Sequence, residues 1–179
     1  MNYIQTGFIS LFSLFLFACG GGGSSSGGGS TAAPTPVENV GGTYTGVWTA
    51  TSSTPQFPDV EPITDDIALT ITITGQQVEV RDGGTFVATG TLSATNGFNA
   101  TTGQFSFSDD DIDCMGEFTF SGTVGNDVAQ GESRGLSRCT DGALSFEILT
   151  TGPFITNRTN GKLGGTSDLR GSILRFLNQ

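Results

Sequence analysis

The sequence predicts an all-β domain whose antiparallel strands form an up-and-down meander and close into a barrel of about eight strands. Apolar and polar residues alternate with a period of two in run after run, which is typical of strands with one buried face. Turns rich in Gly, Asn and Asp separate these runs, and no long helical pattern occurs between residues 42 and 157. A twisted sheet of this size tends to close, because closure removes its edges, so a barrel is favoured over the alternative, a β-sandwich.

The predicted strands follow one another along the domain. In the clearest run, Ile67, Leu69, Ile71 and Ile73 alternate with alanine and threonine, so one face is apolar and the other polar. The same pattern recurs in shorter runs, many of them with phenylalanine on the apolar face. The predicted strand runs are 44–51, 67–74, 78–81, 86–92, 105–107, 118–121, 128–134, 144–148 and 154–158.

The run 128–134 has two alternative registers. Ala129, Gly131 and Ser133 would form an inner face of small residues. The opposite register would place Gln130, Glu132 and Arg134 inside and would create a polar lumen. The alternation of residue types does not choose between these registers.

The first 30 residues have the pattern of an export signal. An apolar run from Phe8 to Phe17 is about half the length that a bilayer-spanning helix needs, and it ends at Ala18-Cys19 before a run of glycine and serine. Leu16-Phe17-Ala18-Cys19 resembles the lipobox of bacterial lipoproteins. The resemblance implies that residues 1–18 are a signal peptide and that Cys19 becomes the lipidated first residue. In the Gram-negative sorting pattern, Gly20 after the cysteine implies an anchor in the outer membrane.

Composition divides the remaining chain into three parts. Residues 19–41 are rich in Gly, Ser and Pro and cannot bury enough surface to offset their ordering entropy, so we expect a flexible tether. A coil of that length reaches roughly 25 Å. Residues 42–158 hold the predicted barrel, and residues 159–179 form a tail.

A Gly-x-Trp pattern stands on the first predicted strand, at Gly46-Val47-Trp48. This pattern resembles the opening strand of lipocalin and avidin-like barrels, in which the tryptophan closes one end of the barrel beside an arginine of the last strand. The resemblance implies that Arg158 covers Trp48 as a cation–π partner. The alternative is that Trp48 and Tyr44, on the same face of the strand, are ordinary core residues.

Two cysteines remain in the domain once Cys19 is assigned to the anchor. In an oxidising compartment, Cys114 and Cys139 are expected to form a disulfide. The alternatives are two buried free thiols or a metal site, but two cysteines supply only half of a zinc site and the chain has no histidine.

Charge and residue usage exclude several classes of function. Residues 19–156 hold sixteen of the seventeen acidic residues but only three of the seven basic ones, so nucleic-acid binding is excluded. The motif Gly131-x-Ser133-x-Gly135 matches a hydrolase nucleophile elbow, but it lacks the strand–turn–helix context and a histidine base. We therefore expect no catalytic residues, no cofactor and no enzymatic activity.

Two acidic clusters are the remaining chemical candidates. Asp109, Asp111 and Asp113 have the alternating spacing that opens a calcium loop, but the glycine and closing glutamate of an EF-hand are missing. A looser calcium site there is the weak alternative to a solvated loop. Asp59 and Glu61, with Asp65 and Asp66, could supply the carboxylate pair of a glycosidase, although a proline-bounded loop with no such role is the favoured interpretation.

The tail contains one helical pattern. Its apolar face would consist of Leu169, Ile173, Phe176 and Leu177. Ser167 or Thr166 would cap its N-terminus. The helix could pack on the barrel wall, lie on a membrane surface, or remain disordered.

These observations leave two functional hypotheses for an outer-membrane lipoprotein. In the first, the barrel is a non-catalytic binding module for a small apolar ligand. In the second, the barrel is filled by its own side chains and the protein is a structural or interaction lipoprotein with another envelope protein as its partner. Under both hypotheses the membrane is contacted through the lipid anchor.

Overall fold

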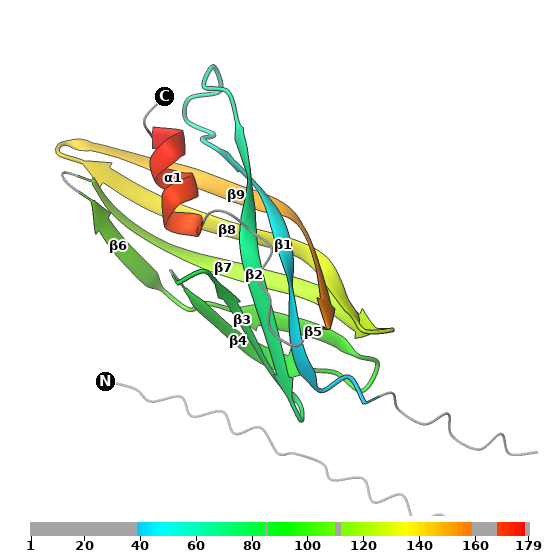
Figure 1. The fold of residues 1–179 in the computed structure, drawn as a ribbon. Coiled ribbons are helices and arrows are strands. Elements are labelled where there is room, and N and C mark those ends of the chain that lie inside the picture. Colours follow the sequence, from blue (N-terminus) through cyan, green and yellow to red (C-terminus); the bar gives the residue numbers. More distant parts are fainter. Residues whose placement is uncertain (1–38, 85, 110–111, 159–167, 178–179) are drawn as a thin grey trace, which may run out of the picture. The chain divides into compact units, whose positions relative to one another are not determined.

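The computed structural model describes residues 39–84, 86–109, 112–158 and 168–177 (Figure 1). The predicted signal peptide and residues 19–38 of the predicted tether lie outside the described residues. The described elements are β1 (Gly42–Ser53), β2 (Ile63–Thr74), β3 (Gln77–Asp82), β4 (Val87–Leu92), β5 (Gly97–Thr101), β6 (Phe105–Asp109), β7 (Ile112–Gly125), β8 (Val128–Asp141), β9 (Leu144–Arg158) and α1 (Leu169–Leu177).

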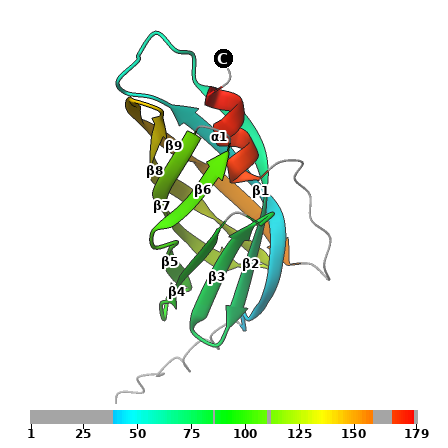
Figure 2. The same cartoon turned by 90° about the vertical axis from the view of Figure 1, so that its left-hand side faces the viewer.

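The strands form a closed antiparallel barrel. Their order in the sheet is β5-β4-β3-β2-β1-β9-β8-β7-β6, and β5 also pairs with β7, which closes the ring (Figure 2). Eight strands therefore form the barrel, as the meander predicted, and the sandwich alternative is wrong. The architecture is compatible with a lipocalin-like barrel.

The ninth strand arises because β5 and β6 pair with successive parts of the same long strand. β5 pairs with the second half of β7, and β6 pairs with Ile112–Gly116 in its first half. The register shifts by one residue across residues 102–104, which is the effect of a β-bulge. Because of this shift, Phe98 and Phe105 both contribute to the core although one position is even and the other odd.

The register of β8 places the small residues inside. Ser133 and Gly135 are buried, whereas Glu132 and Arg134 are exposed. The polar-lumen alternative for this segment is therefore wrong. Charged side chains inside an eight-stranded barrel would be removed from water without partners, which is costly.

Glycines of β8 make space for aromatic rings. Phe118 lies directly opposite Gly135, and a Cβ atom on Gly135 would lie 2.2 Å from Cδ1 of that ring. A Cβ atom on Gly131 would lie 2.8 Å from Cζ of Phe154 and 2.0 Å from the carbonyl oxygen of Ser121. The inner face of β8 is thus shaped to the aromatic residues of its neighbours.

Helix α1 covers a gap in the barrel wall. The short strand β3 pairs only with the second half of β2, Leu69–Thr74, so the first half of β2 is paired with β1 alone. The strand β6, at the end of the sheet order, is paired with β7 alone. Figures 1 and 2 show α1 between β6 and the first half of β2. Its buried residues are Leu169, Ser172, Ile173 and Phe176. For residues 169–177, the first of the three alternatives for the tail is confirmed: the helix packs on the barrel.

The helix begins differently from the prediction. The side chain of Asp168 accepts a hydrogen bond from the backbone N–H of Gly171 at 2.7 Å, so Asp168 is the N-terminal cap. The predicted caps, Ser167 and Thr166, lie outside the described residues. No helix in the described part of the chain is long and apolar enough to cross a bilayer.

Candidate functional site

The barrel interior is the first candidate site, because a barrel of this size holds either one small ligand or its own side chains. Trp48 is fully buried in this interior. Its ring meets Phe86, Phe118 and Phe120 edge to face, with ring centroids 6.2, 5.6 and 5.2 Å away. These distances are typical of favourable aromatic pairs. The part of the interior around Trp48 is therefore a packed aromatic core.

A few polar atoms are buried with this core. The hydroxyl groups of Ser52 and Thr150 bond to each other at 2.9 Å. Among the described residues, Nε1 of Trp48 and Oγ of Ser137 are buried without a hydrogen-bond partner. Buried polar groups are usually hydrogen-bonded, so these two atoms are the interior groups that could bind a further polar group.

Ser133, in the motif that resembles a nucleophile elbow, has a structural role. It lies on β8 rather than on a strand–turn–helix and is 4% exposed. Its hydroxyl donates a hydrogen bond to the carbonyl oxygen of Gly152 on β9 at 3.0 Å. This bond joins two neighbouring strands, and the burial of the side chain keeps the hydroxyl from a substrate in solvent.

The predicted pairing of Trp48 with Arg158 needs a correction. Arg158 lies opposite Tyr44 in the β1–β9 register, whereas Trp48 lies opposite Phe154. The guanidinium group of Arg158 stands over the ring of Tyr44, 5.4 Å from its centroid. Tyr44 and Trp48 are four positions apart on β1, so the strand register places Tyr44, and not Trp48, opposite Arg158 as its cation–π partner. Trp48 is an interior core residue, as the alternative interpretation held.

Arg158 also fixes the segment that leads into the barrel. Its Nη2 donates to the carbonyl oxygen of Asn39 at 2.8 Å and to the hydroxyl of Tyr44 at 3.0 Å. Its Nε lies 3.2 Å from Asp127, and Tyr44 donates to the carbonyl oxygen of Val40. We call the end of the barrel where β1 begins the entry end. Residues 39 and 40 are tied to it by these contacts.

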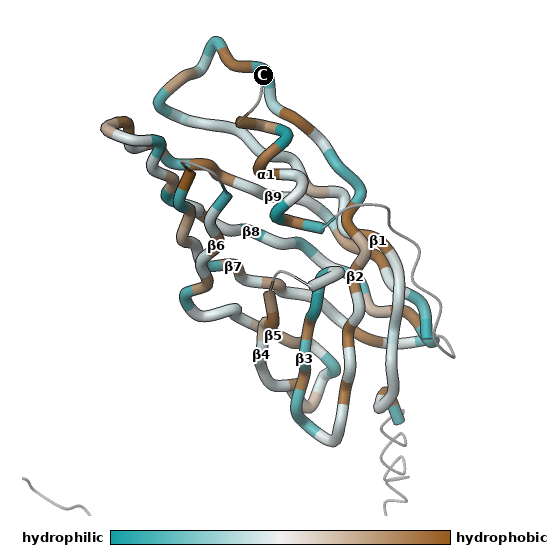
Figure 3. The backbone as a smooth tube through the Cα atoms, turned by 60° about the vertical axis from the view of Figure 1, so that its left-hand side comes forward, coloured by the Kyte–Doolittle hydropathy of each residue, from teal (hydrophilic) through white to brown (hydrophobic). Residues whose placement is uncertain are grey.

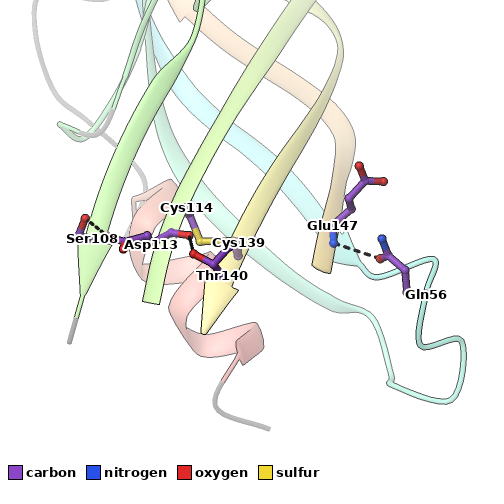
Figure 4. Close-up of a disulfide and its surroundings, with 7 residues drawn as sticks. All are labelled: Gln56, Ser108, Asp113, Cys114, Cys139, Thr140 and Glu147. Atoms are coloured by element: carbon purple, nitrogen blue, oxygen red, sulfur yellow. Dashed lines mark hydrogen bonds between the residues drawn. A yellow bond between two sulfur atoms is a disulfide. The ribbon is translucent and has the colours of Figure 1, made fainter. Parts of the chain in front are cut away.

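The predicted disulfide between Cys114 and Cys139 is confirmed (Figure 4). The two cysteines are direct neighbours on β7 and β8, and both are buried. Thr140, next to Cys139, donates a side-chain hydrogen bond to the carbonyl oxygen of Asp113. The bridge joins the strands near the end opposite the entry end, where the β7–β8 pair runs out.

Replacing both cysteines, as Cys114→Ala/Cys139→Ala, is expected to lower the free energy of unfolding. The bridge joins residues 25 apart, and on the chain-entropy model its loss costs about 3 kcal/mol. Urea unfolding followed by the fluorescence of Trp48, the single tryptophan, measures this change. Reductant should shift the wild-type midpoint and leave the double variant unchanged; equal shifts in both would contradict a stabilising bridge.

The acidic candidates are not brought together as a site. Asp109 forms an ion pair with Arg170, and Asp113 accepts a hydrogen bond from Ser108. Asp111 lies outside the described residues. Asp59 and Glu61 are exposed on the loop between β1 and β2. Within the described ranges, no three His, Cys, Asp or Glu side chains are grouped to hold a metal ion.

Two buried aspartates hold α1 in place, and sequence reasoning did not assign them this role. Asp82 accepts hydrogen bonds from the N–H groups of Phe86 and Leu169, at 3.0 Å each. Asp65 accepts from Ser172 at 2.7 Å and from Arg175 at 2.6 Å. A signal was present, since aspartate at a position of buried parity in a strand needs partners. The identity of those partners, far away in sequence, was not readable.

The pKa shifts indicate no further site. The hydrogen bond from Arg81 lowers the pKa of the Glu79 carboxyl, and the same bond raises the pKa of Arg81. Both side chains stand on the outer surface of β3, joined at 2.6 Å. An exposed pair of this kind is an ordinary surface ion pair.

The comparisons with known proteins assign no family to this chain, so its class of protein is defined by the fold. No protein-family model matches the chain, and the search of curated proteins finds no match. The class of protein defined here is thus a closed eight-stranded antiparallel barrel with a C-terminal helix, compatible with a lipocalin-like barrel.

Proposed function

We propose that this chain is a non-catalytic lipoprotein of the bacterial cell envelope that presents a filled β-barrel to another envelope protein. The observation that carries this proposal is the packing around Trp48, because aromatic side chains packed edge to face against its ring occupy the space that a ligand would need. A filled barrel is a rigid scaffold, and its function then resides in its outer surface and loops.

The sequence around Cys19 supports a lipid anchor in the outer membrane. The domain itself is strongly acidic, so an anionic membrane surface would repel it. A covalent lipid at Cys19 would overcome that repulsion. The contacts of Arg158 with Asn39 support an arrangement in which the entry end is the end held by the tether. The opposite end, with the loop between β1 and β2, would then face away from the membrane.

Cys19→Ser is expected to release the protein from membranes, because the thiol that accepts the lipid is lost. Fractionation of cells followed by immunoblotting measures the distribution between membrane and soluble fractions. Ser24→Ala, in the adjacent glycine–serine run, is the matched control and should remain with the membranes. Retention of Cys19→Ser in the membrane fraction would overturn the lipoprotein assignment.

A small ligand inside the barrel is the second candidate function. One observation favours it: Nε1 of Trp48 and Oγ of Ser137 are buried without partners among the described residues. A ligand with an apolar body and a hydrogen-bond acceptor would suit a site that includes the indole N–H. The aromatic packing around the same tryptophan favours the filled barrel.

Native mass spectrometry of the purified protein separates the two candidates. The filled barrel predicts a mass equal to that of the processed, lipidated chain alone. A bound metabolite or lipid that is released on denaturation would instead support the second candidate. Trp48→Phe removes the indole N–H while keeping an aromatic side chain, so this variant should weaken retention of a genuine interior ligand.

A further inference from the structure

The loop between β1 and β2, residues 54–62, is held in a defined conformation. The N–H of Phe57 donates to the carbonyl oxygen of Thr54 at 3.2 Å, and the N–H of Val60 donates to that of Phe57 at 3.0 Å. Gln56 accepts a hydrogen bond from the N–H of Glu147 at 3.1 Å, which fastens the loop to β9 (Figure 4). Prolines at positions 55, 58 and 62 further restrict the backbone. The loop is therefore pre-organised.

This loop exposes a phenylalanine side chain, a residue type that is buried or partly buried everywhere else in the described part of the domain. Phe57 is 53% exposed, and Val60 beside it is 37% exposed. Of the ten phenylalanines in the described part of the chain, Phe57 alone is exposed. A pre-organised loop that displays an apolar side chain loses less conformational entropy on binding than a flexible loop would. Phe57 therefore has the properties of an interface anchor.

The charges around Phe57 are acidic. Asp59 and Glu61 are exposed on the same loop, and the loop carries no basic residue. Figure 3 shows hydrophobic and hydrophilic residues next to each other along this loop. The basic residues near this end are in ion pairs: Arg138 with Glu147, Arg170 with Asp109, and Arg175 with Asp65. A partner surface rich in lysine or arginine would complement this end of the barrel.

We infer that residues 54–62 are the docking site for a protein whose apolar pocket receives Phe57 and whose lysine or arginine side chains meet Asp59 and Glu61. This inference rests on the proposed function and deepens it, since the loop stands at the end opposite the entry end. Acidic flanks disfavour an anionic lipid surface as the occupant.

Site-specific photo-cross-linking of the full chain in its native cells tests the inference. The photoreactive residue is introduced as Phe57→p-benzoyl-phenylalanine, and the matched control is Thr95→p-benzoyl-phenylalanine in an exposed turn at the entry end. We expect a protein adduct from position 57 that is absent from position 95. Mass spectrometry should map the cross-link to apolar residues flanked by lysine or arginine.

Charge reversal makes the test specific. Asp59→Lys/Glu61→Lys should reduce the adduct at least tenfold, and in a binding assay with the identified partner Phe57→Ala should raise Kd at least tenfold. Both sets of positions are exposed, so the melting temperature serves as the folding control. No adduct, a lipid adduct, the same adduct from position 95, or an adduct insensitive to charge reversal would each overturn the inference.

The outcome is distinguishable from a failure of the proposed function. If Cys19→Ser stays in the membrane fraction but the charge-sensitive adduct forms, the anchor assignment fails and the docking site stands. If Cys19→Ser is released and no protein adduct forms from position 57 in the wild-type background, the lipoprotein stands and the docking site is wrong.

Discussion

Replacing Gly135 with alanine is expected to lower the free energy of unfolding by about 3 kcal/mol. The new Cβ atom would lie 2.2 Å from the ring of Phe118. That ring cannot move aside easily, since it is fully buried and packs on Trp48 and Phe86. Urea unfolding monitored by the fluorescence of Trp48 measures the loss.

The control for this prediction is Gly83→Ala. A Cβ atom there would lie 3.7 Å from its nearest neighbour, Cβ of Asp168, which is an ordinary van der Waals distance. The control should unfold within about 0.5 kcal/mol of the wild type. Equal stability of the two variants would show that the register of β8 differs from the one described, because only the small-residue register brings Gly135 against Phe118.

Ile173→Asp is expected to detach α1 from the barrel at a cost of about 4 kcal/mol or more. Ile173 is fully buried in the core, and a carboxylate at its position would lose its water without gaining a cation. The same substitution would add a carboxylate to a helix whose Ser172 and Arg175 already bind the carboxylate of Asp65 on β2. Urea unfolding gives the stability, and limited proteolysis reports the release of the C-terminus.

Leu174→Asp is the matched control on the same helix. Leu174 is only half-buried, so a carboxylate there can remain in water and the loss should be much smaller. Rapid cleavage of the C-terminal segment is expected for Ile173→Asp alone. A stable, uncleaved Ile173→Asp variant would show that the stability of the barrel does not depend on the packing of α1 beside β2.

Alternation in the sequence was sufficient to predict the strands because burial in a barrel is decided residue by residue. Leu69, Ile71 and Ile73 are buried in the core as their period of two requires, and the threonines between them, Thr70 and Thr72, are only partly buried. Alternation does not predict burial where a strand extends beyond the end of the barrel. Leu144 belongs to an apolar run, yet it is 68% exposed because the β8–β9 hairpin extends beyond the residues that could cover it.

The candidate site was less predictable because its contacts join distant parts of the chain. The partner of Arg158 depended on which residue of β1 lies opposite it, and register made that residue Tyr44 rather than Trp48. The exposure of Phe57 was equally hidden, since a phenylalanine in a proline-bounded loop can fold inward or outward.

The sequence by itself determined the class of fold, the disulfide and the helical character of residues 169–177, because these depend on local period and on the number of cysteines available. Only the tertiary structure decided which residues of β8 face inward, where the bulge between β5 and β6 lies, and where α1 packs beside Asp65 and Asp82. These features depend on which surfaces meet when the barrel closes. Closure selects the register in which small residues face aromatic rings, and that choice becomes visible only when β7, β8 and β9 are side by side.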